Sequence, residues 1–258
     1  MTTARCIYRE EHDDTHLEIW EEGDHRSLWF DDVILQTEIH LQDPAVLPNP
    51  VNRAMLAHLM FDAVIERVML AGCGGGAIAR WLHARAPEVA GDAVELSPTV
   101  ARLAREYFDF PPPESNWRLL IEDVRDHLVH TEASYDFILI DLEENQVTPA
   151  WVTDAGFLAR CRDHLGPDGI LVINLILGDT AEISRALLRV RQAFGSDTLL
   201  LDEVDHDNLL VFAFRSALPA MPTGEELRQR GQRWGIDFAG LVRRITHVAA
   251  NASAHDAG

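Results

Sequence analysis

Lysine is absent from this 258-residue sequence, so all 22 basic residues are arginines and Schiff-base chemistry through a lysine is excluded. Cysteine is scarce. Cys6, Cys73 and Cys161 are odd in number, lie far apart and form no CxxC pair, which argues against a disulfide framework and a zinc site. No apolar run approaches the roughly 18 residues of a transmembrane helix, and the first residues lack the apolar core of a signal peptide. We therefore expect a cytoplasmic protein without a membrane partner.

Positive charge is also in short supply, because 42 acidic residues outnumber the basic ones and give a net charge of −20. Such a surface repels phosphate backbones, so we expect no nucleic-acid partner. It favours cationic ligands at long range, although solubility alone is the alternative explanation. The sequence contains no HExxH pair, no GxSxG elbow and no Walker turn, so metal, hydrolase and NTPase sites are not predicted.

Short alternating apolar segments near the start predict a small antiparallel sheet, with strands at 16–20, 27–30 and 33–37 and a turn at Asp31-Asp32. A helix is predicted from Val51 to Ala63.

From residue 66 strands and helices alternate, which predicts a doubly wound, mostly parallel α/β sheet of seven strands. The predicted strands are 67–71, 92–96, 118–121, 137–141, 170–175, 199–204 and 209–214, and the predicted helices are 77–86, 98–107, 124–130, 150–164 and 180–194. Residues 224–247 are predicted to form one or two amphipathic helices before a frayed tail. We expect an N-terminal β-domain over 1–50, a nucleotide-binding catalytic domain over 51–216 and a helical extension over 217–258.

A glycine-rich turn, Gly72-Cys73-Gly74-Gly75-Gly76, follows the strand at 67–71 and precedes a helix. Glycines at this point let the backbone approach a ligand closely and aim helix N–H groups at it. Gly72-x-Gly74-x-Gly76 fits folds that bind S-adenosylmethionine, whereas Gly72-x-Gly74-x-x-Ala77 fits the dinucleotide fingerprint. The remaining alternative is a tight turn without a ligand.

Acidic residues end the next strands. Glu95, about 20 residues after the turn, is placed to accept hydrogen bonds from both hydroxyls of a ribose. Asp123 follows the third strand, where it would lie beside an adenine or cap the helix at 124–130. Asp141 and Glu144 follow the fourth strand, where a carboxylate suits a sulfonium donor and is able to take a proton from an attacking amine. An acidic surface loop is the alternative for this last pair.

In their order, these motifs resemble those of the spermidine synthase family of aminopropyltransferases, from about residue 17 to 215. The resemblance also involves the segment 28–38 and Met55-Leu56-Ala57-His58-Leu59. It implies that Gly72, Gly74 and Gly76 face the donor's thioether arm, that Gln36 lies near its sugar and that Asp141 lies beside the reacting amine. Gly75 is also predicted to be a donor-binding residue. The implied donor is S-adenosylmethionine or its decarboxylated form, the implied acceptor is a small amine, and the implied assembly is a homodimer.

Three departures from the family pattern affect the amine end of the site. The family turn ends Gly-Gly-Gly-Asp-Gly, and Gly75 stands at the position of its aspartate. The family Asp-x-x-Asp-Pro is Asp141-Leu142-Glu143-Glu144-Asn145 here, and Asn52-Arg53-Ala54 replaces its Tyr-His-Glu. An aspartate at position 75 would repel the carboxylate of intact S-adenosylmethionine, so glycine is predicted to admit that donor. Alternatives to aminopropyl transfer are a methyltransferase, a catalytically silent nucleotide-binding homologue and an NAD-dependent enzyme.

Overall fold

The computed structural model describes residues 3–12, 15–31, 33–61, 64–176, 178–195, 197–203 and 208–250. Several predictions fall partly outside these ranges: the turn at Asp32, the helix end at 62–63, the strand end at Val204, the connection at 205–207 and the tail at 251–258. By its internal contacts the chain divides into two compact units, Met1–Arg53 with Met69–Val124, and Ala54–Val68 with Arg125–Gly258.

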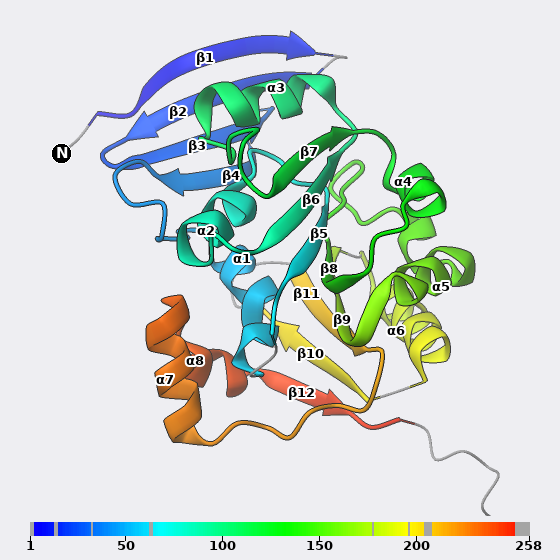
Figure 1. The fold of residues 1–258 in the computed structure, drawn as a ribbon. Coiled ribbons are helices and arrows are strands. Elements are labelled where there is room, and N and C mark those ends of the chain that lie inside the picture. The colour runs from blue at the N-terminus through cyan, green and yellow to red at the C-terminus, as the bar shows by residue number, and fades with distance from the viewer. Residues whose placement is uncertain are drawn as a thin grey trace, which may run out of the picture. The chain divides into compact units, whose positions relative to one another are not determined.

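Four antiparallel strands form the first sheet of the first unit, in the order β1-β2-β3-β4 (Figure 1). Their bounds are Arg5–His12 (β1), Thr15–Glu22 (β2), His25–Phe30 (β3) and Ile34–His40 (β4). Leu17, Ile19 and Leu28 are almost fully buried and define its core face. The helix α3 (Pro98–Tyr107) lies alongside this sheet, where Arg102 pairs with Glu10 at 2.6 Å.

The prediction missed β1, because Arg5–His12 is rich in charge and has no apolar alternation. Its strand conformation comes from pairing with β2, a tertiary interaction that overrides weak local propensity.

Among the described residues the second sheet has eight strands, in the order β12-β10-β11-β9-β8-β5-β6-β7. The first unit contributes β6 (Ala90–Glu95), β7 (Trp117–Ile121) and the end of β5 (Arg67–Ala71), with the helices α2 (Ala77–Arg85) and α3. β6 and β7 pair in parallel, and Glu95 lies opposite Ile121.

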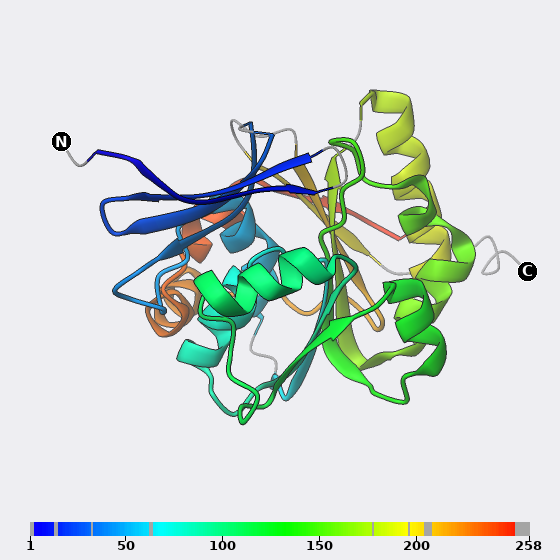
Figure 2. The same ribbon diagram turned by 90° about the horizontal axis from the view of Figure 1, so that it is seen from above.

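In the second unit β8 (Tyr135–Ile140) and β9 (Leu165–Ile176) pair in parallel. β11 (Asn208–Phe214) then pairs with β9, β10 (Thr198–Asp202) with β11, and β12 (Ile245–Val248) with β10, and these three pairings are antiparallel. The helices here are α4 (Val124–His130), α5 (Ala155–Asp163) and α6 (Thr180–Phe194), and α5 and α6 lie side by side (Figure 2). The 3₁₀ turn η2 (Ala150–Thr153) precedes α5.

The C-terminal segment completes this unit. The helices α7 (Gly224–Trp234) and α8 (Phe238–Val242) contact the 3₁₀ turn η1 (Leu56–Met60), which follows α1 (Pro50–Met55) (Figure 1). Among the described residues no helix has the length and apolarity needed to span a membrane.

The predicted fold class is confirmed, with two added strands, β1 and β12, and two broken helices. Residues 245–248 form β12 and not a helix, because Ile245, Thr246 and Val248 are β-branched and the segment pairs along the edge of β10. The predicted helix from Val51 tightens into a 3₁₀ turn at Leu56, and the predicted helix at 150–164 is interrupted at Asp154.

Candidate functional site

The glycine turn continues directly from the buried strand β5 and is fixed at both ends by its own backbone. The Gly72 N–H donates to the Val94 carbonyl at 2.9 Å, and the Gly76 N–H donates to the Cys73 carbonyl at 2.7 Å. Gly72, Gly74 and Gly76 have positive φ angles of 76°, 51° and 82°, which L side chains rarely adopt. The turn therefore requires glycine at these positions before any ligand is considered.

Gly75 is required for a different reason, because protein atoms fill the space beside its Cα. A Cβ there would lie 2.8 Å from Thr37 Cγ2 and 2.9 Å from Phe108 Cγ. The Gly75 N–H donates to Thr37 Oγ1 at 2.7 Å, and this hydroxyl in turn donates to the Gln36 carbonyl at 2.7 Å. The turn thus packs against β4, and the backbone of Gln36 lies against Gly74.

This contact corrects one step of the sequence argument. The glycine turn was expected to aim its backbone N–H groups at a ligand, whereas Thr37 Oγ1 already accepts the N–H of Gly75. The prediction that Gly75 itself contacts the ligand remains a prediction.

Glu95 ends β6 and binds the glycine turn from the other side. Its Oε2 accepts the Cys73 N–H at 3.3 Å, and its Oε1 accepts the Ser97 N–H at 3.0 Å. Burial raises the pKa of Glu95, while these backbone N–H groups act in the opposite direction by stabilising the carboxylate. The backbone N–H groups of Gly74 and Leu96 also bind this carboxylate, so backbone donors already occupy most of its acceptor sites. A ribose hydroxyl would bind Glu95 beside these donors or in place of one of them, and the predicted ribose contact remains a prediction.

Cys73 lies inside the turn, and its thiol is held protonated. Burial raises its pKa well above the usual value, and the negative charge of Glu95 raises it further. A thiol with a raised pKa is a poor nucleophile, so Cys73 fits a packing role in the turn.

Asp123 lies at the same carboxyl edge as Glu95. The N–H of Glu122 donates to the Glu95 carbonyl at 3.1 Å, which fixes the end of β7 beside the end of β6. Leu96 and Ile121 are 68% and 47% exposed at these strand ends. Large exposed apolar side chains beside a carboxylate suit a flat ligand that covers them while hydrogen-bonding at its rim.

The remaining predicted residues belong to the second unit. Asp141 directly follows the buried strand β8, and its Oδ1 accepts a hydrogen bond from Asn174 Nδ2 at 2.8 Å. Desolvation by the surrounding protein raises the pKa of Asp141, and the Asn174 hydrogen bond lowers it by a smaller amount. Asp141 is nevertheless exposed to solvent, so the surrounding protein desolvates the carboxylate without covering the residue.

Sequence reasoning missed the residues that hold Asp141 in place. Asn174 is 3% exposed on β9, and its Oδ1 accepts from Asn208 Nδ2 of β11 at 2.9 Å, which fixes the orientation of the amide. Thr148 Oγ1 accepts the Ile176 N–H at 2.8 Å and donates to the Asn174 carbonyl at 3.2 Å. The available signal was one asparagine within the otherwise apolar run 170–176.

Glu144 occupies a different environment from Asp141. The segment between them ends in a tight turn closed by Glu144 and Val147, whose N–H and carbonyl groups pair at 2.9 and 3.2 Å. Asn145 and Gln146 at its centre have φ angles of 54° and 64°, as a type I′ turn requires. Glu144 is exposed at the base of this turn.

The first unit thus offers a glycine turn whose backbone binds the Glu95 carboxylate. The second unit offers an oriented carboxylate, Asp141, of raised pKa. Among the described residues no group of three or more His, Cys, Asp or Glu side chains is placed to hold a metal ion.

Known proteins are similar to this chain in sequence and in fold. The sequence pattern of the family described as "Methyltransferase domain" matches residues 68–169. The polyamine aminopropyltransferase of Chromobacterium violaceum is 30% identical over 244 residues, which cover 93% of this chain and 92% of that protein. A probable spermidine synthase from Corynebacterium glutamicum superposes with a TM-score of 0.77 at 20% identity, covering 94% and 90% of the two chains. A spermidine synthase in complex with the transition-state analogue AdoDATO gives a TM-score of 0.69 at 20% identity, covering 94% and 84%.

Proposed function

Because this chain belongs to the polyamine aminopropyltransferase family, we propose that it transfers an aminopropyl group from an S-adenosyl sulfonium donor to a small amine. The observation that carries the proposal is Asp141, a carboxylate at the end of β8 whose orientation is fixed by Asn174 at 2.8 Å. The raised pKa of Asp141 makes this carboxylate a stronger base and so better suited to take a proton from the attacking amine.

The residues of the first unit fit an S-adenosyl group. The glycine turn lets the thioether arm lie against backbone, Glu95 accepts the two ribose hydroxyls, and Asp123 accepts the exocyclic amine of the adenine. The exposed side chains of Leu96 and Ile121 are covered by the adenine ring in this assignment.

The reaction is a direct displacement. The amine nitrogen attacks the aminopropyl carbon next to sulfur, and the C–S electron pair returns to sulfur to give neutral 5′-methylthioadenosine. The nitrogen loses its proton to Asp141. Because the sulfonium is already an activated leaving group, positioning and desolvation supply most of the acceleration.

The isosteric variant Asp141→Asn tests the assignment of the base. It removes the proton acceptor and keeps the size of the side chain, so turnover should fall by about 10²- to 10⁴-fold while donor affinity is retained. Glu144→Gln is the matched control and should keep most of the activity. Full activity in Asp141→Asn would remove Asp141 from the catalytic role, and a larger loss in Glu144→Gln would transfer that role to Glu144.

Donor choice is the second part of the proposal. No acid stands at position 75 to repel a donor carboxylate, so discrimination against intact S-adenosylmethionine is weaker here than in family members that carry the aspartate. Titration calorimetry with the intact and decarboxylated donors measures this directly. Similar affinities would support the proposal, and a strong preference for the decarboxylated donor would contradict it.

Methyl transfer is the second candidate, favoured by the methyltransferase-domain match over residues 68–169 and by Gly75. It uses the same donor residues and differs in which carbon is attacked. Release of S-adenosylhomocysteine in place of 5′-methylthioadenosine would identify it.

A further inference from the structure

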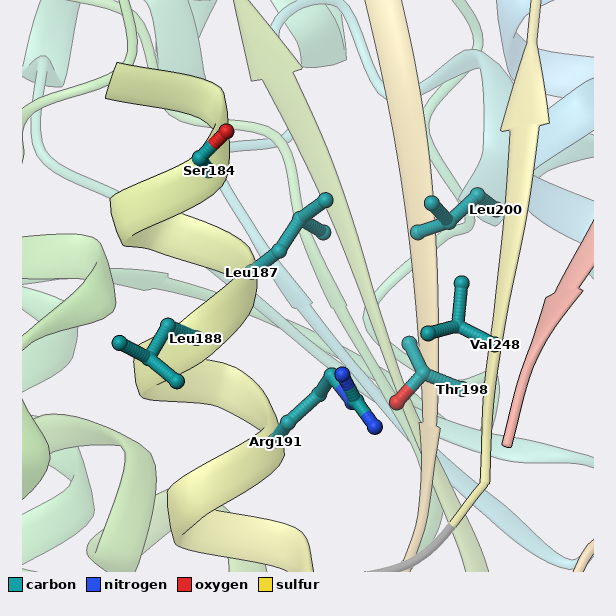
Figure 3. Close-up of a pocket in the computed structure, with 7 residues that line it drawn as sticks. All are labelled: Ser184, Leu187, Leu188, Arg191, Thr198, Leu200 and Val248. Carbon is teal, nitrogen blue, oxygen red and sulfur yellow. The ribbon is translucent and has the colours of Figure 1, made fainter. Parts of the chain in front are cut away.

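A cavity of about 330 Å³ lies in the second unit between α6 and the strands β10 and β12 (Figure 3). The residues that line it belong to none of the motifs assigned above. Its walls are mainly apolar, formed by Leu187 and Leu188 of α6, Leu200 of β10 and Val248 of β12. The side chains of Leu187 and Leu200 point toward one another across the gap (Figure 3).

The periodicity of these elements builds the cavity. Leu187 and Arg191 are four residues apart and share the side of α6 that is turned to β10, whereas the side chain of Leu188 points away from β10 (Figure 3). Thr198 and Leu200 share one face of β10, and Val248 lies opposite Thr198 in the pairing with β12. Leu188, 51% exposed, lies at the open side.

Polar groups gather at one end of the cavity. Thr198 is fully buried, and its Oγ1 has no hydrogen-bond partner among the residues that the structure describes. A buried hydroxyl without a partner costs free energy, which a ligand that accepts its hydrogen would recover. The guanidinium of Arg191, which also donates to the Ala249 carbonyl, and the Thr198 hydroxyl point toward one another (Figure 3).

We propose that this cavity binds a small aliphatic monocarboxylate, with its carboxylate on Arg191 and Thr198 and its alkyl chain among the leucines. The positive charge of Arg191 selects an anion, and the apolar walls select a ligand with a hydrocarbon body. A volume of about 330 Å³ corresponds to on the order of ten non-hydrogen atoms at the roughly 30 Å³ occupied by one water, which matches a chain of about eight carbons.

Titration calorimetry of the full chain with sodium octanoate tests the ligand class, with octanol and octylamine as controls of matched length. Octanoate should bind, octanol should bind about tenfold more weakly because it lacks the charge-assisted hydrogen bonds, and octylamine should not bind. Absence of octanoate binding, or equal binding of octylamine, would overturn the proposal.

Three variants locate the binding. Leu187→Trp fills the cavity and should abolish octanoate binding, and Arg191→Gln should weaken it about tenfold or more. Arg185→Gln, at an exposed position of the same helix, is the matched control and should bind like the wild type. Unchanged binding in both Leu187→Trp and Arg191→Gln would place octanoate elsewhere and contradict the assignment.

Thr198→Val gives a readout that does not depend on those two variants. It removes the buried hydroxyl with little change in shape, so it should raise the melting temperature of the ligand-free protein and weaken octanoate binding. A lower melting temperature together with unchanged octanoate affinity would show that the hydroxyl has a structural partner and no part in the site.

Discussion

At Gly75 the packing of the protein and the departure from the family pattern are linked. Its Cα faces Thr37 and Phe108, so the aspartate that the family pattern has at this point would collide with protein atoms in this chain. The departure from the family pattern is therefore matched by the residues that surround it. Reversing it requires changes in β4 or at the end of α3 as well.

The substitution Gly75→Ala measures this constraint. Its Cβ would lie 2.8 Å from Thr37 Cγ2, so we expect a loss of about 1–3 kcal/mol in the free energy of unfolding, measured by denaturant titration. Thr37→Ser removes the obstructing methyl and keeps Oγ1, so the double variant should recover part of the loss. Gly156→Ala is the control, since the nearest atom is 4.0 Å away. Equal effects at positions 75 and 156 would contradict the packing argument.

His58 is a second residue whose surroundings predict a measurable property. It is 3% exposed, its ring lies 4.3 Å from that of Phe137, and its Nδ1 lies 3.1 Å from the Met55 carbonyl. Burial lowers the pKa of His58 from 6.5 to about 4, so the folded state holds this imidazole neutral.

The unfolded chain binds this proton more tightly, and stability therefore falls as the pH drops from above 6.5 toward 4. Between about pH 7 and pH 5 the contribution of His58 is about 2 kcal/mol. Chemical denaturation of His58→Phe at both pH values should show a smaller acid-induced loss than the wild type by about this amount, with exposed His130→Phe as the control. An unchanged difference between the two pH values would show that His58 does not cause the acid sensitivity.

At the scale of elements, the second unit positions its carboxylate through three strands. Asp141 ends β8, Asn174 is on β9 and Asn208 is on β11, and two amide hydrogen bonds connect them. The Thr148 hydroxyl, in the segment between β8 and η2, accepts the Ile176 N–H and so connects this segment to β9. Connected hydrogen bonds of this kind, anchored on the buried Asn174, hold the Asp141 carboxylate in one orientation.

Asn174→Ala should therefore move the pH profile as well as the rate. The Asn174 hydrogen bond stabilises the charged form of Asp141 and lowers its pKa, so its removal raises that pKa. The acid limb of kcat/KM should shift to higher pH, because the carboxylate must be ionised to accept a proton. A loss of activity at all pH values without a shift of the limb would assign Asn174 a purely structural role.

The sequence predicted the helices and most strands better than the contacts between them. Three helices, α3, α4 and α6, begin and end where the pattern placed them, because start signals such as Ser97-Pro98 and Asp179 are local. β1 and β12 were missed because each is an edge strand specified by its partner. The contact of Thr37 with Gly75 joins residues 38 positions apart, and no local pattern encodes it.

At the scale of the whole molecule, the net charge of −20 is the property that a polyamine acceptor would experience first. A negative field raises the local concentration of a multivalent cation, and salt screens it over about 10 Å at 0.1 M. We expect KM for a diamine to rise with ionic strength while kcat changes little. A monoamine acceptor should respond less, and an equal response would show that the acidic surface serves solubility alone.

Product analysis tests the central claim, aminopropyl transfer, most directly. The purified chain is incubated with decarboxylated S-adenosylmethionine and a diamine, and the nucleoside and amine products are identified by mass spectrometry, with Asp141→Asn as the inactive control. We expect 5′-methylthioadenosine together with an amine extended by one aminopropyl group. A methylated acceptor with release of the demethylated nucleoside, or no consumption of either substrate by a chain that binds the donor, would contradict it.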